Sequence, residues 1–138
     1  MADIDAIRKK ITEKIESGEF SREDLENYFI IFCEIGRKSE DFQDEIEGWD
    51  RNIVFDLCEA GMFWISTVGG NVSTGIGGSK NVDLTLKMNI ENVLKIFSGE
   101  LDPGLAFMTG KLKLKGELPD ALKFSELMEI VADEIESN

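Results

Sequence analysis

The chain has 138 residues, a length typical of one domain, and 42% of them are hydrophobic. Its 28 acidic and 15 basic residues give a net charge of -13, which repels nucleic acid at long range and argues against it as a partner. It has no histidine, and Cys33 and Cys58 do not form a CxxC pair. We therefore expect no metal site, no cofactor and no enzyme with a histidine base.

The sequence also carries an expectation about the compartment. The N-terminal segment lacks the apolar core of a signal peptide. The longest aliphatic and aromatic run, from Tyr28 to Cys33, is far shorter than the roughly 20 residues that cross a bilayer. We expect a cytoplasmic protein with two buried, reduced thiols and at most transient membrane contact, and we leave protein partners open.

Residues 1–48 are predicted to form helices, because their apolar residues recur at helical spacing. The first helix carries Ile4, Ile7, Ile11 and Ile15. The apolar face of the second consists of Leu25, Tyr28, Phe29, Phe32 and Ile35. Ser39 is placed to cap a short third helix.

Beyond Gly48 the apolar residues alternate, as in a strand. Strands are predicted over 53–57, 62–68, 72–76 and 82–88, joined by short glycine-rich turns. Because short turns join antiparallel neighbours, we expect a meander. The segment MFWISTV (62–68) does not indicate which face of its strand carries Trp64.

The last third mixes helices with one more strand. Asn89 is placed to cap a helix over 90–97, and Asp102-Pro103 is a strong start signal for another. The segment KLKLK (111–115) predicts a fifth strand, and a final helix begins near Pro119.

This order of elements predicts an α+β fold in a single domain, residues 1–138. N-terminal helices occupy 1–48, a five-stranded, mainly antiparallel sheet with inserted short helices occupies 49–116, and a C-terminal helix occupies 117–138. We expect the helices to cover one face of the sheet.

Two motifs suggest phosphate binding and have simpler interpretations. The glycine-rich segment 69–80 has Ile76 where a phosphate-binding loop needs a lysine, so turns explain it better. The lysines of KLKLK lie on one face of the predicted strand, where they could hold a phosphate or protect a sheet edge from aggregation.

Residues 97–127 resemble the C-terminal signature of the sterol carrier protein type 2 family, the non-specific lipid-transfer proteins. The matching residues, in order, are Asp102-Pro103, Ala106-Phe107, Gly110-Lys111-Leu112-Lys113-Leu114 and Gly116. Upstream, Ile53–Asp56 and Met62–Trp64 are similar to the family's first hairpin. The N-terminal helices make the chain most similar to stand-alone microbial members. Thr109 departs from the glutamine that often precedes the glycine in the family.

This resemblance implies a hydrophobic tunnel between sheet and helices for a fatty acid, a fatty acyl-CoA or a sterol-like lipid. The predicted ligand-binding residues are Phe55, Trp64, Leu84, Leu86, Phe97, Phe107, Met108, Leu112, Leu114 and Phe124. Strand alternation supports Leu84, Leu86, Leu112 and Leu114 independently. An empty apolar void of about 400 Å³ would cost on the order of 10 kcal/mol. We therefore expect the tunnel to be filled, wet or partly collapsed.

Two other functions remain open at this point. With a solid interior, the same sequence would form an interaction module that docks a partner enzyme through the sheet face or the terminal helix. Hydrolysis of acyl-CoA ranks third, because the sequence shows no nucleophile beside a base. Transfer and storage of a lipid are not distinguished.

Overall fold

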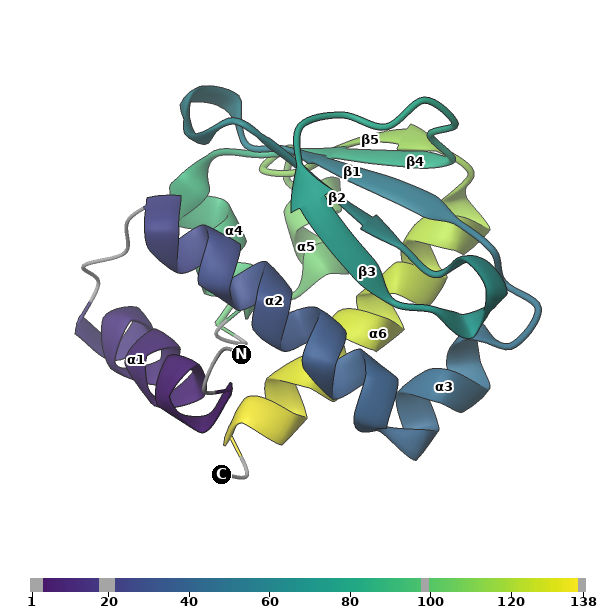
Figure 1. Ribbon diagram of the computed structural model, residues 1–138. Coiled ribbons are helices and arrows are strands. Elements are labelled where there is room, and N and C mark those ends of the chain that lie inside the picture. The colour runs from purple at the N-terminus through teal and green to yellow at the C-terminus, as the bar shows by residue number, and fades with distance from the viewer. Residues whose placement is uncertain (1–3, 18–21, 98–99, 137–138) are drawn as a thin grey trace.

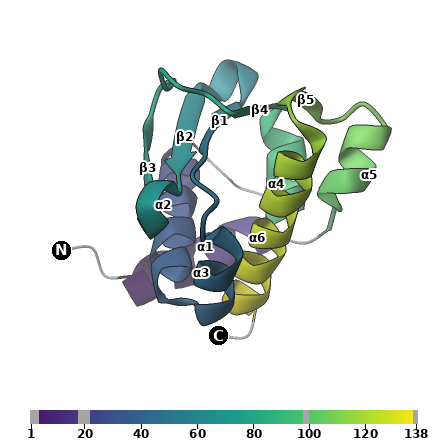
Figure 2. The same ribbon diagram turned by 90° about the vertical axis from the view of Figure 1, so that its right-hand side faces the viewer.

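The computed structural model describes residues 4–17, 22–97 and 100–136. The helices and strands of this part of the chain are, in order, α1 (Ile4–Ser17), α2 (Arg22–Lys38), α3 (Glu40–Ile46), β1 (Asn52–Asp56), β2 (Met62–Ser66), β3 (Ser73–Ile76), β4 (Leu84–Lys87), α4 (Ile90–Phe97), α5 (Pro103–Met108), β5 (Lys113–Gly116) and α6 (Leu118–Glu136). Figures 1 and 2 show the helices gathered on one face of the sheet, which confirms the predicted α+β architecture.

The sheet has five strands in the order β3-β2-β1-β4-β5. The pairs β1–β2, β2–β3 and β4–β5 are antiparallel, whereas β1 and β4 are parallel. The prediction of a mainly antiparallel sheet is confirmed. The prediction of a simple meander is wrong, because β3 and β4 are not neighbours.

The connection over residues 77–83 explains the error. Since β3 runs in the same direction as β1 and β4, this segment must return along the sheet from the end of β3 to the start of β4. Its seven residues can span roughly 23 Å when extended, which is enough for a four-residue strand. A short connection is therefore compatible with β3 and β4 running parallel to each other without being neighbours.

The inner face of the sheet carries the apolar residues that the alternation predicts. Paired positions on β1, β2 and β4 place six buried side chains on this face: Ile53, Phe55, Phe63, Ile65, Leu84 and Leu86. Against them pack the aromatic residues of α2 and the buried face of α6. The ring centre of Phe29 lies 5.1 Å from that of Phe55 and 5.0 Å from that of Phe63.

Trp64 lies on the outer face, because its partner across the strands is Val54 and not an inward residue. Its indole covers Gly75, where an added Cβ would come within 2.6 Å of the ring. Gly75 on β3 therefore makes room for the indole of Trp64, which lies on the neighbouring strand β2.

The predicted capping residues are confirmed. The Ser39 hydroxyl accepts a hydrogen bond from Phe42 N at the start of α3. The Asn89 side chain accepts one from Asn92 N before α4, and the Asp102 carboxylate accepts one from Leu105 N at the start of α5.

Candidate functional site

An apolar pocket of about 60 Å³ lies between α5, α6 and the β4–β5 side of the sheet. The sheet side contributes Leu86, Leu112 and Leu114, while α5 contributes Pro103, Gly104 and Phe107. The residues from α6 are Leu118, Ala121, Leu122, Ser125 and Met128. Among these lining residues, Ser125 supplies the one polar side chain. The pocket is therefore suited to a hydrocarbon group.

The turn after α5 brings Leu112 under the pocket. Gly110 has a φ of 79°, a conformation that a glycine adopts without strain. The backbone N–H groups of Lys111 and Leu112 then both donate to the carbonyl of Ala106, at 2.8 and 3.1 Å. Leu112 is left 6% exposed, so this turn fixes one wall of the pocket.

Helix α6 forms the opposite wall because it has two apolar faces. One face packs into the core through Phe124, Leu127 and Val131, all fully buried. The other face repeats at Leu118, Leu122 and Ser125, a spacing of four and three residues that also lies on one side of a helix. This second face lines the pocket, and Leu118 and Leu122 remain 51% and 56% exposed.

The structure brings together four of the ten predicted ligand-binding residues: Leu86, Phe107, Leu112 and Leu114 all line the pocket. Met108 follows Phe107 on α5 and is 82% exposed. The other predicted residues lie elsewhere or outside the described part.

Phe55, Leu84 and Phe124 are fully buried in the core between the sheet, α2 and α6, and they do not line this pocket. Trp64 is on the outer face of the sheet. The Phe97 side chain lies outside the described residues, although its backbone ends α4.

Sequence reasoning named none of the α6 residues that line the pocket, since Phe124, the one α6 residue among the predicted ligand-binding residues, lies in the core. The pocket face of α6 was detectable in principle, since Leu118, Ala121, Leu122 and Ser125 are spaced as a second stripe beside the core stripe. Two overlapping stripes look like a helix that is apolar nearly all round, which obscures the distinction between core and pocket.

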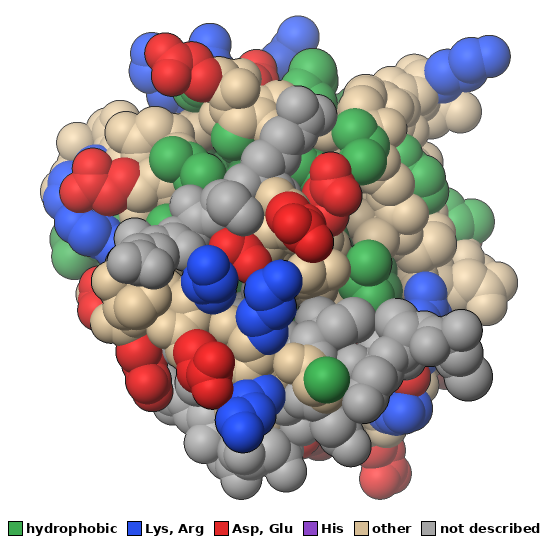
Figure 3. Space-filling model, turned by 60° about the vertical axis from the view of Figure 1, so that its left-hand side comes forward, with side chains coloured by type: hydrophobic (Ala, Val, Ile, Leu, Met, Phe, Trp, Pro, Cys, Tyr) green, Lys and Arg blue, Asp and Glu red, His purple; other side chains and the backbone are tan. Residues whose placement is uncertain are grey.

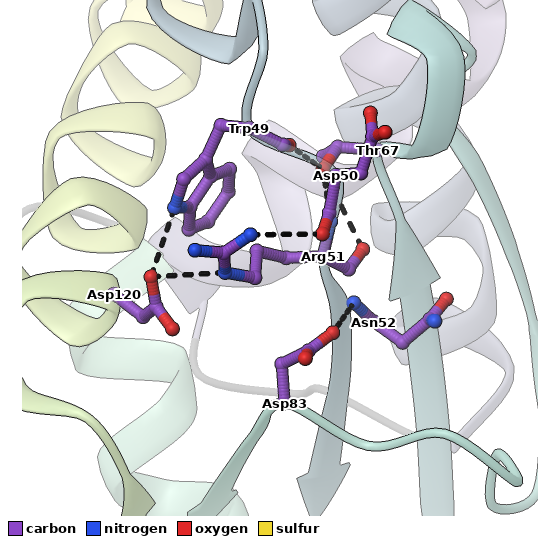
Figure 4. A network of polar contacts seen from close by, with 7 residues as sticks. All are labelled: Trp49, Asp50, Arg51, Asn52, Thr67, Asp83 and Asp120. Atoms are coloured by element: carbon purple, nitrogen blue, oxygen red, sulfur yellow. Dashed lines mark hydrogen bonds and ion pairs between the residues drawn. The ribbon is translucent and has the colours of Figure 1, made fainter.

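A polar network fixes the first turn of α6 against the sheet (Figure 4). One carboxylate oxygen of Asp120 accepts hydrogen bonds from Trp49 Nε1 and from Arg51 Nε, each at 3.0 Å. The Arg51 guanidinium also lies 5.7 Å from the centre of the Trp49 ring. Asp120 lies between the pocket residues Leu118 and Ala121, so the network holds one wall of the pocket.

The same network closes the end of the β1–β2 hairpin. The Thr67 hydroxyl donates to the Trp49 carbonyl at 2.8 Å and accepts from Arg51 N at 3.2 Å, and Thr67 is fully buried. On the other side of β1, the Asp83 carboxylate accepts from Asn52 N at 2.8 Å (Figure 4). These contacts anchor the start of β1 to segments on both sides of it.

A second hollow of about 130 Å³ adjoins the apolar pocket. Its lining includes Ile96, Leu101, Glu129 and Ala132, and it shares Pro103 and Met128 with the first pocket. Both hollows are below the roughly 300 Å³ at which ligand pockets begin. An acyl chain would therefore have to displace side chains, of which Met128 is the most adaptable.

The described residues show no arrangement suited to nucleophilic catalysis with either thiol. Burial raises the pKa of the Cys33 thiol to about 12, against a smaller opposing effect of the Arg37 charge. Cys58 is exposed, so the prediction that both thiols are buried is wrong for this residue. It lies between β1 and β2, at the start of a single 3-10 turn, Cys58–Ala60. In the described part, no three His, Cys, Asp or Glu side chains come together to hold a metal ion.

The two thiols should differ sharply in reactivity. We expect an aromatic disulfide reagent to label Cys58 in the folded protein and to label Cys33 only after unfolding, because the thiolate is the reactive form and Cys33 is buried. Absorbance at neutral pH, with and without urea, measures this. In the Cys58→Ser variant the folded protein should be unreactive, whereas Cys33→Ser should react as the wild type does. Equal labelling rates at the two sites would contradict the packing around α2.

Comparison with known proteins identifies the family. Residues 32–129 match the model of the SCP-2 sterol transfer family. The chain is 37% identical over 89 residues to human hydroxysteroid dehydrogenase-like protein 2, a match that covers 62% of this chain and 21% of that protein. The chain thus spans about a fifth of the length of this curated relative.

Solved structures agree with the fold. The sterol carrier protein domain 2 of Helicoverpa armigera matches with a TM-score of 0.64 and 24% identity, over 77% of this chain and 86% of that one. Apo sterol carrier protein 2 of Yarrowia lipolytica matches with a TM-score of 0.62 and 20% identity, over 78% and 91% of the two chains. No described helix has the length and apolar character needed to cross a bilayer. The family model covers most of the sequence, and the chain belongs to the SCP-2 sterol transfer family.

Proposed function

We propose that this chain binds a fatty acid, a fatty acyl-CoA or a sterol-like lipid through its hydrocarbon part, in the pocket between α5 and α6. The observation that carries the proposal is the lining itself, in which leucines from β4, β5 and α6 face Phe107 and Pro103. Membership of a lipid-transfer family supports it. The names of the solved neighbours, which are sterol carrier proteins, support the same ligand class.

The small volume of the pocket fits a ligand-free state that is partly collapsed. An open void of about 400 Å³ would cost on the order of 10 kcal/mol, close to the whole stability of a domain. When a ligand enters, movement of Met128 would join the apolar pocket to the second hollow, since both are lined by this side chain. The continuous tunnel stays a prediction.

The affinity expected from hydrocarbon burial is moderate. About ten methylenes at about 0.8 kcal/mol each give about 8 kcal/mol, which corresponds to a dissociation constant of roughly 1 μM before ordering costs. Such an affinity allows both loading and release, as a transfer function requires.

The test compares two leucine-to-tryptophan changes on the inner face of neighbouring strands. Leu114→Trp should fill the pocket and weaken binding of a fluorescent fatty acid at least tenfold, with little loss of stability, because Leu114 lines the pocket and is only partly buried. Leu84→Trp should instead destabilise the protein by about 1–3 kcal/mol or more through overpacking, because Leu84 is fully buried away from the pocket.

Fluorescence titration measures the binding and urea unfolding measures the stability. Native mass spectrometry of protein purified from its source should also show a co-purified lipid. Absence of saturable binding in the wild type would overturn the proposal and favour an interaction module. Unchanged binding in a folded Leu114→Trp variant would place the ligand elsewhere.

A further inference from the structure

Half of the exposed large hydrophobic side chains of the described residues belong to α5 and the start of α6, the two helices that line the pocket. Ten such residues are exposed in the described part of the chain, and five of them lie between residues 105 and 122. Those five are Leu105, Phe107, Met108, Leu118 and Leu122. Large contiguous patches of exposed apolar surface often mark a binding site for a protein or a membrane. We call these five side chains the apolar rim.

The apolar rim is continuous with the interior of the pocket. Phe107, Leu118 and Leu122 each line the pocket and are also 44–56% exposed. Met108, at 82% exposure, extends the same apolar surface along α5 towards solvent. A hydrocarbon chain could therefore pass between the pocket and a surface covering the rim without crossing water.

The segment that supplies α5 and β5 differs in charge from the rest of the molecule. Residues 103–116 contain Lys111, Lys113 and Lys115 and no acidic residue, in a chain with a net charge of -13. All three lysines are exposed, and none forms an ion pair with a carboxylate of the described residues. Other described basic residues divide between those in ion pairs, such as Arg51 and Lys123, and those without one among the described residues, such as Lys80 and Lys87. The three lysines are therefore distinguished by their clustering in an acid-free segment.

Two of the lysines belong to the strand that forms part of the pocket wall. Lys113 and Lys115 project from the outer face of β5, the edge strand whose inner Leu114 lines the pocket. Figure 2 shows α5, β5 and the start of α6 at the same end of the molecule. On the face shown in Figure 3, acidic and basic side chains are interspersed among separate hydrophobic patches.

We infer that the apolar rim docks on an anionic lipid bilayer, with the rim in the acyl boundary and the lysines of β5 at the phosphates, so that the pocket opens onto the bilayer. A membrane fits better than a protein partner, because the surface joins apolar groups to a cluster of lysines at a hydrocarbon-lined opening. The acidic remainder of the chain would be repelled by the same bilayer, which favours this one orientation. The inference rests on the proposed function, since the docked pocket is the lipid-binding site.

The experiment measures co-sedimentation of the ligand-free chain with vesicles of phosphatidylcholine alone or mixed with phosphatidylserine. We expect binding to the mixed vesicles that weakens in high salt. Met108→Glu should reduce it at least tenfold. The matched control is Ile76→Glu, which changes a 60% exposed side chain on β3, the opposite edge of the sheet, and should leave binding unchanged.

The contribution of the β5 lysines is tested with the same co-sedimentation measurement. Lys113→Glu should weaken binding to phosphatidylserine vesicles several-fold, whereas Lys38→Glu, at the end of α2, should not. Loss of binding in all four variants alike, or no binding by the wild type, would overturn the inference. Self-association that Met108→Glu abolishes, without vesicle binding, would overturn it in favour of a second copy of the chain.

Fatty acid titration without vesicles separates this inference from the proposed function. Met108 does not line the pocket, so the folded Met108→Glu variant should bind the fluorescent fatty acid with wild-type affinity. Vesicle binding without fatty acid binding would reject the lipid-binding proposal and leave the docking surface. Fatty acid binding without vesicle docking would reject the docking surface and leave the lipid-binding proposal.

Discussion

Replacing Phe124 by alanine is expected to lower the free energy of unfolding by about 3–5 kcal/mol. The ring is fully buried, and its centre lies 5.7 Å from that of Phe32 on α2 and 5.5 Å from that of Phe55 on β1. Its removal would leave a cavity where α2, α6 and the sheet meet. Urea unfolding, followed by the fluorescence of the two tryptophans, measures the loss.

The control is Leu122→Ala, two residues earlier on α6. Leu122 is 56% exposed and lines the pocket, so this change should alter stability by less than about 0.5 kcal/mol and should weaken fatty acid binding instead. A stable Phe124→Ala protein that binds more lipid would show that Phe124 lines the ligand space, as the sequence alone suggested.

These two changes separate the two apolar regions of the molecule. The core on the α2 side is closed by aromatic rings in mutual contact, with centres 5.0–5.7 Å apart. On the α5 side, Leu86 is the β4 residue that lines the pocket, and it is only 3% exposed. A lipid that extended from the pocket towards Phe55 would have to displace this aromatic packing, which makes the direction past Met128 less costly.

Local patterns predicted the features that depend on few neighbouring residues. The alternation on β1 and β4 correctly placed Phe55, Leu84 and Leu86 on the inner face, because strand side chains alternate whatever their partners are. The caps at Ser39 and Asp102 were predicted for the same reason, since a cap bonds to the backbone within three residues.

Features that depend on distant pairing were not predictable in this way. The parallel pairing of β1 with β4 requires the 77–83 segment to cross the sheet, and nothing in its length distinguishes that path from a tight turn. The outward position of Trp64 follows from its pairing with Val54 and from the space above Gly75. Both depend on which strands are neighbours.

The sequence likewise did not predict which inward residues belong to the core and which line the pocket. Leu84 and Leu86 are two residues apart on one strand face, yet only Leu86 reaches the pocket, because α5 and the first turns of α6 cover that part of the sheet. Composition and alternation are the same for both. Their difference comes from where α6 lies against the sheet, and one contact that holds its first turn there joins Trp49 to Asp120, 71 residues apart in the chain.

Replacing Asp120 by alanine is expected to lower the free energy of unfolding by about 1–3 kcal/mol, because the 8% exposed Trp49 would lose the acceptor of its indole N–H. Asp120→Asn keeps an acceptor oxygen and loses only the charge attraction between residue 120 and the partly exposed Arg51, so its cost should be smaller. We also expect faster release of a fluorescent fatty acid from Asp120→Ala, measured by stopped flow, since the freed turn carries Leu118 and Ala121 of the pocket wall.

The exposed Asp133 on the same helix gives the control Asp133→Ala, with no expected effect on either the free energy of unfolding or the rate of fatty acid release. Equal behaviour of the two alanine variants would show that the wall is held by apolar packing alone, whereas an equal cost for Asp120→Asn and Asp120→Ala would transfer the main role from Trp49 to Arg51.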